Sequence, residues 1–124
     1  MMTWAVAFHE DFDAEFREFS EEVQDELLAM AKLLEQFGPM LKRPRADTLS
    51  GSKHANMKEL RFSAADGEWR VAFAFDPKRE AILLVGGDKA GVSQKQFYRT
   101  LIRNADERFD KHLAHLKKAE GGKK

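Results

Sequence analysis

The sequence predicts an α+β domain: a small antiparallel sheet with an N-terminal two-helix hairpin packed on one face and a C-terminal helix. Apolar residues have helical spacing in residues 12–37 and again in 97–116, whereas residues 57–86 form short alternating runs separated by turn residues. Hydrophobic residues make up 43% of the 124-residue chain, which is enough for one compact core. We expect a single domain over residues 1–118 and a flexible tail at 119–124.

The first forty residues predict a strand followed by a helix. Residues 3–8 are apolar and bounded by charge, which indicates a strand. The period then becomes helical, and one apolar stripe has the spacing i, i+4 and i+7: Phe12, Phe16 and Phe19. The other side of this helix is acidic, so the phenylalanines are expected to face the sheet.

A second helix is predicted directly after the first. Ser20 is a suitable N-cap, because a serine hydroxyl accepts a hydrogen bond from an unpaired N–H group of the first turn. Gly38 and Pro39 predict the end of the helix. Five apolar residues are expected to form its buried stripe: Val23, Leu27, Met30, Leu34 and Phe37.

The middle of the chain predicts a loop and then an antiparallel meander. Residues 40–55 have no period and are expected to form an ordered connecting loop. The three strands of the meander are expected at residues 57–63, 68–75 and 80–86. Two turns should join them, one at Asp66-Gly67 and one at Asp76-Pro77.

The last helix is long and is preceded by a flexible link at residues 86–91. Ser93 and Gln96 have the spacing of a capping box, which predicts the start of this helix. Its expected apolar stripe consists of Tyr98, Ile102, Ala105, Phe109, Leu113 and Leu116, flanked by Phe97 and Leu101.

Strand alternation assigns side chains to the two faces of the sheet. Residues two apart point the same way, so Trp69, Val71 and Phe73 should pack on the helical hairpin while Arg70 points to the opposite face. By the same argument Leu60 and Phe62 point inward, and Glu59 and Arg61 point outward beside Arg70. The sequence therefore predicts two adjacent guanidinium groups in a half-open basic groove, a suitable geometry for phosphate. Alternatively, Glu59 neutralises one of the two arginines as a cross-strand pair.

Charge is balanced overall but not along the chain. Basic and acidic residues number 21 each, yet residues 1–40 carry ten acidic residues against Arg17 and Lys32. The remainder can thus present a positive surface to nucleic acid, although two ordinary solvated faces are an alternative. The basic residues expected to contact RNA phosphates are Lys42, Arg43, Arg45, Lys53 and Lys95.

Several classes of function are disfavoured. The chain has no cysteine, which excludes disulfides, zinc–thiolate sites and iron–sulfur clusters, and fits a reducing cytoplasm. No apolar run is long enough for a membrane span, and we expect neither export nor membrane association. Residues 86–91 lack the spacing of a nucleotide-binding loop. His112 and His115 lie at i and i+3 on the last helix, but no further ligand completes a set, so no metal and no cofactor are predicted.

Three local motifs and one strand–loop segment follow this order of elements: Leu49-Ser50-Gly51, Lys58-Glu59-Leu60-Arg61, Trp69-Arg70-Val71, and Ile82–Val85 leading into Gly86-Gly87-Asp88-Lys89. In these features the chain resembles the RelE/ParE toxin superfamily, specifically its HigB-like, phage-derived Gp49-like branch. The resemblance implies the toxin of a bacterial type II toxin-antitoxin system, which cuts mRNA on the ribosome without a metal ion, by attack of the ribose 2′-hydroxyl. It also implies a cognate antitoxin, expected to be a helix-turn-helix protein, with a heterotetramer as one assembly that it allows.

The resemblance extends to individual positions. Arg70 matches the arginine of the family's aromatic-Arg-Val strand, Arg61 matches its Leu-Arg, and Lys89 matches the basic residue after the fourth strand. Tyr98, or its neighbour Phe97, falls near the position of a tyrosine that some relatives carry on the last helix. These matches imply that Arg61, Arg70, Lys89 and Tyr98 take part in catalysis.

The general base is where this sequence departs from the family pattern. The lysine pair of RelE is represented here by Met57 and Glu59, with only Lys58 between them. His54 or Lys58 is therefore predicted as a substitute base.

Two other functions use the same fold. A ParE-like toxin inhibits gyrase without catalysis, and an inactive module would only capture a partner by a sheet edge or a helix groove. The presence of all three of Arg61, Arg70 and Lys89 favours the endonuclease.

Overall fold

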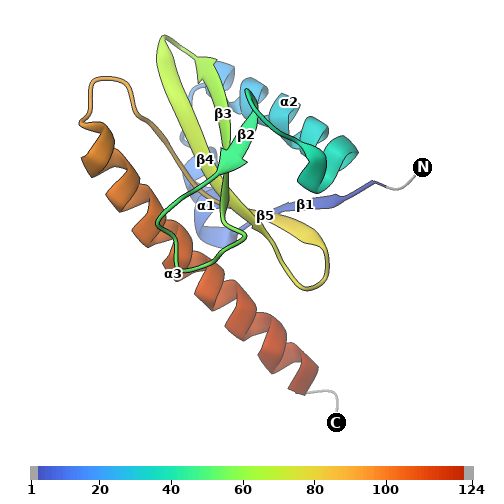
Figure 1. Cartoon of the computed structure of the whole chain (residues 1–124). Helices are drawn as coiled ribbons and strands as arrows, with labels where there is room; N and C mark the ends of the chain where they lie inside the picture. Colours follow the sequence, from blue (N-terminus) through green and yellow to red (C-terminus); the bar gives the residue numbers. More distant parts are fainter. Residues whose placement is uncertain (1–2, 122–124) are drawn as a thin grey trace.

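The structure is a computed structural model that describes residues 3–121, and it confirms the predicted α+β architecture (Figure 1). The elements are β1 (Ala5–Phe8), α1 (Glu10–Phe16), α2 (Glu21–Phe37), the short 3₁₀ helix η1 (Gly38–Met40), β2 (Ala46–Thr48), β3 (Lys58–Ala64), β4 (Gly67–Phe75), β5 (Glu80–Asp88) and α3 (Gln94–Gly121). The strands form one sheet in the order β1-β5-β4-β3-β2. In the part of the chain that the structure describes, no helix is long and apolar enough to cross a bilayer.

Two apolar layers enclose the sheet. One layer joins α1 and α2 to the face that carries Val71 and Phe73, and the other joins α3 to the face that carries Ala72 and Ala74. Figure 1 shows α3 crossing the sheet on the side opposite α2. The strand alternation predicted from the sequence is therefore confirmed.

The expected helix caps are present. The Ser20 hydroxyl accepts a hydrogen bond from the Val23 N–H at 3.4 Å, and the Ser93 hydroxyl accepts one from Gln96 N–H at 3.4 Å. The predicted burial of Phe37 is wrong, since this residue is 48% exposed. The Trp4 indole lies directly against Gly38 and occupies the space beside the end of α2.

The sheet is mixed, because β1 runs parallel to β5 while the other pairs are antiparallel. A strand that the sequence did not predict, β2, lies within the expected loop and pairs with β3. The β3–β4 turn is Ala65-Asp66, both with positive φ, so Gly67 already belongs to β4 and the prediction was one residue late. Three strand residues cannot show a readable alternation, which explains why β2 was missed.

Both ends of the C-terminal helical region differ from the expectation. β5 extends to Asp88, so only part of residues 86–91 is a link. Helix α3 extends through Gly121, and residues 119–121 of the expected flexible tail are therefore helical. Residues 122–124 of that tail lie outside the described part of the chain.

Candidate functional site

Three arginines lie in a row across the sheet. The Cα atom of Arg61 on β3 is opposite that of Arg70 on β4, and the Arg61 N–H donates a hydrogen bond to the Arg45 carbonyl at 2.8 Å. All three line an open pocket of about 380 Å³ at the edge of β3, which we call the arginine pocket. Its other lining residues are Met30, Pro44, Phe62, Ser63 and Glu68. The structure thus brings Arg61 and Arg70 together, as the alternation predicted.

The two strand arginines have different surroundings. Arg70 is 4% exposed, and its Nη1 donates a hydrogen bond to the Trp69 carbonyl at 2.8 Å. Arg61 is less buried, and its Nη1 lies 3.5 Å from Glu59 Oε2 and 3.9 Å from Asp47 Oδ2. Glu59 therefore contacts an arginine, but this is Arg61 of its own strand and not a cross-strand partner. The pair is long, and Arg61 still faces the pocket.

Glu59 and Tyr98 complete this cluster. Glu59 is 4% exposed, and burial raises the pKa of its carboxyl more than the Tyr98 hydroxyl and the two arginines lower it. Burial, and then the adjacent Glu59 carboxylate, raises the pKa of Tyr98 above its ordinary value. Tyr98 therefore keeps its proton at neutral pH and lies beside Glu59 and Arg70.

Lys89 follows β5 near the same end of the sheet. Its N–H donates a hydrogen bond at 2.8 Å to the carbonyl of Glu68, a residue of the arginine pocket. Lys95 is exposed in the first turn of α3. Both residues are basic and lie close along the chain to the start of the helix that carries Tyr98.

Lys58 lies on the other face of the sheet. It alternates in phase with Leu60 and Phe62, which pack toward α2, and it lines a separate pocket with Lys42 and Arg43. Arg43 forms an ion pair with Asp47 at 2.8 Å, and this contact lowers the pKa of that carboxyl. The expectation that Lys58 serves beside the arginines is thus corrected, because strand geometry directs it away from them.

His54 and Lys53 are held by the middle of α3. His54 Nε2 lies 2.8 Å from Asp110 Oδ1, its ring meets Phe109 edge-on, and Lys53 forms an ion pair with the same aspartate. Asp110 is twelve residues after Tyr98, or roughly 18 Å along the helix at 1.5 Å per residue. The structure therefore separates His54 from the arginine pocket, and the prediction of His54 as its base is corrected.

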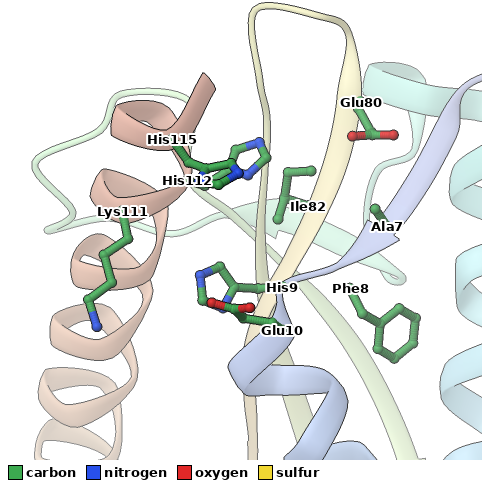
Figure 2. Close-up of a pocket in the computed structure, with 9 residues that line it drawn as sticks. All are labelled: Ala7, Phe8, His9, Glu10, Glu80, Ile82, Lys111, His112 and His115. Atoms are coloured by element: carbon green, nitrogen blue, oxygen red, sulfur yellow. The ribbon is translucent and has the colours of Figure 1, made fainter. Parts of the chain in front are cut away.

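A second pocket, of about 330 Å³, lies at the other end of β5 and contains three histidines: His9, His112 and His115 (Figure 2). His112 Nε2 lies 2.8 Å from Oδ2 of the buried Asp76. The sequence did not indicate that His9 joins the two helix histidines. Within residues 3–121 no group of three or more His, Asp or Glu residues is arranged to hold a metal ion.

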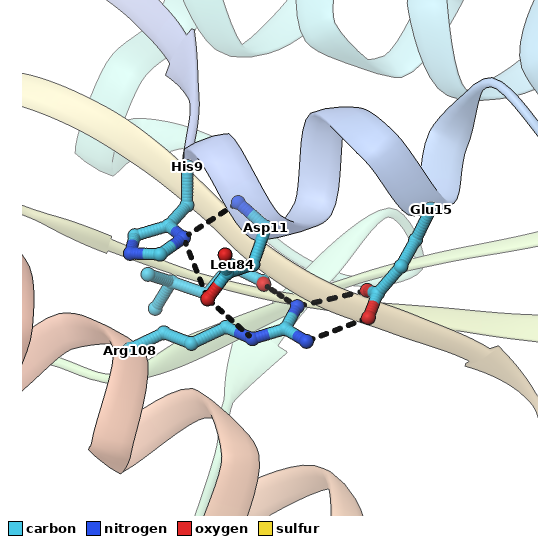
Figure 3. A network of polar contacts seen from close by, with 5 residues as sticks. All are labelled: His9, Asp11, Glu15, Leu84 and Arg108. Atoms are coloured by element: carbon cyan, nitrogen blue, oxygen red, sulfur yellow. Dashed lines mark hydrogen bonds and ion pairs between the residues drawn. The ribbon is translucent and has the colours of Figure 1, made fainter.

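Arg108 links α3 to α1 in a contact that sequence reasoning missed (Figure 3). Its guanidinium donates to both Glu15 carboxylate oxygens, at 2.8 and 2.6 Å, and to the Leu84 carbonyl at 2.8 Å. Asp11 Oδ2 lies 4.0 Å from Arg108 Nε. Helix α3, which also carries Tyr98, is thus linked to the N-terminal helical hairpin.

Comparison with known proteins identifies a family and two relatives that are similar to this chain in sequence. The family described as phage derived protein Gp49-like (DUF891) matches residues 14–110. The chain is 47% identical over 96 residues to the candidate toxin HigB2 of Mycobacterium tuberculosis (strain ATCC 25618 / H37Rv), and 51% identical over 82 residues to the candidate toxin HigB3 of the same organism. These alignments cover 77% and 66% of this chain. The chain spans 47% of HigB2, about half its length, and 69% of HigB3.

Among solved structures, a mutant of the E. coli toxin RelE in the free state has the same fold. The TM-score is 0.60 over 82% of this chain and 95% of that chain, with 12% sequence identity. The predicted resemblance is therefore confirmed in both sequence and fold. Since the matched region runs from α1 into α3 and includes every residue of the arginine pocket, the chain belongs to the phage-derived Gp49-like family.

Proposed function

We propose that this protein is the toxin of a type II toxin-antitoxin system and acts as a ribosome-dependent mRNA endonuclease. The observation that carries the proposal is the direct pairing of Arg61 with Arg70 beside an open pocket that also contains Arg45. The names of the relatives HigB2 and HigB3 support a toxin, and the RelE-like fold is compatible with one.

The chemistry of the arginine pocket suits RNA cleavage by the 2′-hydroxyl. The 2′-oxygen attacks the neighbouring phosphorus while its proton passes to solvent water, and the bond to the 5′-oxygen breaks to leave a 2′,3′-cyclic phosphate. The attack places additional negative charge on the phosphoryl oxygens, and guanidinium groups stay charged and bind two such oxygens at once. Arg70 is nearly buried and held by the Trp69 carbonyl, so little reorganisation is needed before it binds the phosphate. Proper alignment of the 2′-hydroxyl is then supplied by the ribosome.

Tyr98 is the candidate proton donor. Its pKa is raised, so the hydroxyl is protonated at neutral pH and can give a proton to the leaving 5′-oxygen. Lys89 and Arg45 extend the positive charge on either side of the two strand arginines. We therefore retain Arg61, Arg70, Lys89 and Tyr98 in the proposed site, and leave out His54 and Lys58.

The proposal includes partners. The ribosome and mRNA are the substrate complex, which would place the protein in the cytoplasm. A cognate antitoxin is expected to silence it, and a small helix-turn-helix protein encoded beside the gene would support this part of the proposal.

The test is cleavage of a defined mRNA by the purified protein, with and without ribosomes, followed by mapping of the new 5′ ends. We expect cleavage only with ribosomes, and a loss of at least 100-fold in Arg70→Gln and Arg61→Gln, because each removes a charge that stabilises the transition state. Arg17→Gln is the matched control, since Arg17 is exposed on the N-terminal hairpin and pairs with Asp13. Circular dichroism and thermal unfolding establish that the variants are folded.

Three results would overturn the proposal. Full cleavage by both arginine variants would remove the arginine pocket from the chemistry. A wild-type protein that leaves mRNA intact but inhibits DNA supercoiling by gyrase would instead be a ParE-like inhibitor, and one that does neither would be a binding module.

A further inference from the structure

A buried carboxylate adjoins residues of the proposed site, and folding does not account for it. Glu59 is in the middle strand of the β2-β3-β4 group, with Asp47 opposite it on one side and Ala72 on the other. It is 4% exposed. Among residues 3–121, its Oε1 has no hydrogen-bond partner, and neither does the buried Nε of Arg70.

Burial of such a group is energetically unfavourable for folding. Removing a carboxylate from water is unfavourable unless partners replace the lost solvation, and an apolar residue of similar size is often as stable or more so. The contact between Arg61 and Oε2 is long, at 3.5 Å, and Oε1 has no partner. The lost solvation of the Glu59 carboxylate is therefore only partly replaced. The raised pKa of the Glu59 carboxyl has the same cause. A role outside folding is therefore indicated.

The neighbours of Glu59 suggest what that role is. Its Oε2 contacts the Arg61 guanidinium, and its charge acts on Tyr98 and Arg70, each from a different element of the fold. These three are the residues proposed to contact the scissile phosphate and the leaving group. Glu59 itself is buried and is not among the residues that line the arginine pocket.

We propose that Glu59 is a positioning residue: its carboxylate fixes the Arg61 guanidinium and the Tyr98 hydroxyl in the geometry that RNA cleavage requires. This inference rests on the proposed endonuclease function. Arg61 has a long, flexible side chain, and ordering it before substrate binds removes an entropy cost from the reaction. Displacement of a reacting group by about 1 Å can lower the rate about 100-fold.

The decisive variant is Glu59→Gln, which keeps the shape of the side chain and removes its charge. We expect its kcat for ribosome-dependent cleavage to fall at least ten-fold, while KM stays within two-fold and the melting temperature is unchanged or higher. Glu59→Asp, which keeps the charge at a shorter reach, should recover part of the rate. Glu80→Gln, a strand carboxylate at the other end of β5, is the control.

The pH profile separates positioning from a merely structural contribution. In the wild type, protonation of Glu59 as the pH falls should release Arg61 and Tyr98, so that kcat declines on the acidic side. Glu59→Gln should lack this decline and remain slow throughout. A wild-type kcat in Glu59→Gln, or an unchanged acidic decline, would overturn the proposal.

A second readout does not depend on activity. Tyr98 is the one tyrosine in the sequence, so the tyrosinate absorbance on alkaline titration reports it alone. The pKa of Tyr98 should lie above 10.0 in the wild type and fall in Glu59→Gln, because the neighbouring negative charge is gone. An unchanged titration would overturn the contact itself. If the wild type does not cleave mRNA, the proposed endonuclease function is overturned. The Tyr98 titration would still decide whether Glu59 acts on Tyr98.

Discussion

Replacement of Arg108 by methionine should destabilise the fold by about 2–3 kcal/mol. The Arg108 side chain is 15% exposed and donates to the Leu84 carbonyl, and a hydrogen bond from a charged donor is worth about 1.5–3 kcal/mol. The Glu15 side chain is 43% exposed, so solvent screening limits its ion pair with Arg108 to about 0–1 kcal/mol. Methionine keeps the apolar stem, so the loss reports the guanidinium contacts rather than packing.

Urea denaturation measures this loss. With an m value of about 1–3 kcal/mol per M for a small protein, the midpoint should fall by about 1–2 M while m stays constant. In a double-mutant cycle with Glu15→Gln, the coupling energy between Arg108 and Glu15 should be below about 1 kcal/mol, because most of the effect comes from the hydrogen bond to the Leu84 carbonyl. Arg103→Met, at an exposed position of the same helix, is the control.

The reasoning is refuted if Arg108→Met loses less than about 0.5 kcal/mol, the range of an ordinary surface substitution. A coupling energy with Glu15 as large as the whole loss would also contradict it. In that case the ion pair, and not the carbonyl contact, would hold α1 to α3.

Two further predictions concern the turn before α3 and the first helix cap. Gly67→Ala should lower the free energy of unfolding by about 1–3 kcal/mol in urea denaturation, because the new methyl group would lie 2.5 Å from the Asp88 carboxylate. This carboxylate accepts hydrogen bonds from the N–H groups of Glu68 and Ala90, which restrict its movement. A loss below about 0.5 kcal/mol would mean that the turn before α3 adapts to the methyl group. Burial lowers the pKa of His9 from its ordinary value of 6.5, so its contribution to stability is present above pH 6.5 and is lost as the pH falls toward its folded value. His9→Asn keeps a capping acceptor for Asp11 N–H, so its stability should fall less steeply than the wild type between pH 7 and 5, and equal slopes would contradict this account.

The predictable part of the site follows from alternation. Side chains on one strand alternate between its two faces whatever the strand packs against. Because the apolar neighbours Leu60, Phe62 and Val71 point into the core, Arg61 and Arg70 could be predicted to point to the opposite face. The same rule would have directed Lys58 away from the arginines, since it is in phase with Leu60. Proximity to Arg61 along the chain does not bring Lys58 to the same face of the sheet.

The remaining contacts depend on tertiary packing. His54 meets Asp110 and Arg108 meets Glu15 across 56 and 93 residues, and no local pattern encodes such pairs. The parallel pairing of β1 with β5 likewise has no counterpart in the sequence of either strand. The predicted elements were therefore more reliable than the predicted neighbours of loop and helix residues.

Helix α3 is one uninterrupted rod from Gln94 to Gly121, and this continuity has a mechanical consequence. It carries Tyr98 close to its beginning, grips Ser52 through Asp106, and reaches the opposite layer through Arg108. Rotation of this helix about its axis would displace the Tyr98 ring, the loop that carries Ser52 and the contact with Glu15 together. Tyr98, the Ser52 loop and the contact with the N-terminal hairpin are therefore mechanically coupled through a single helix.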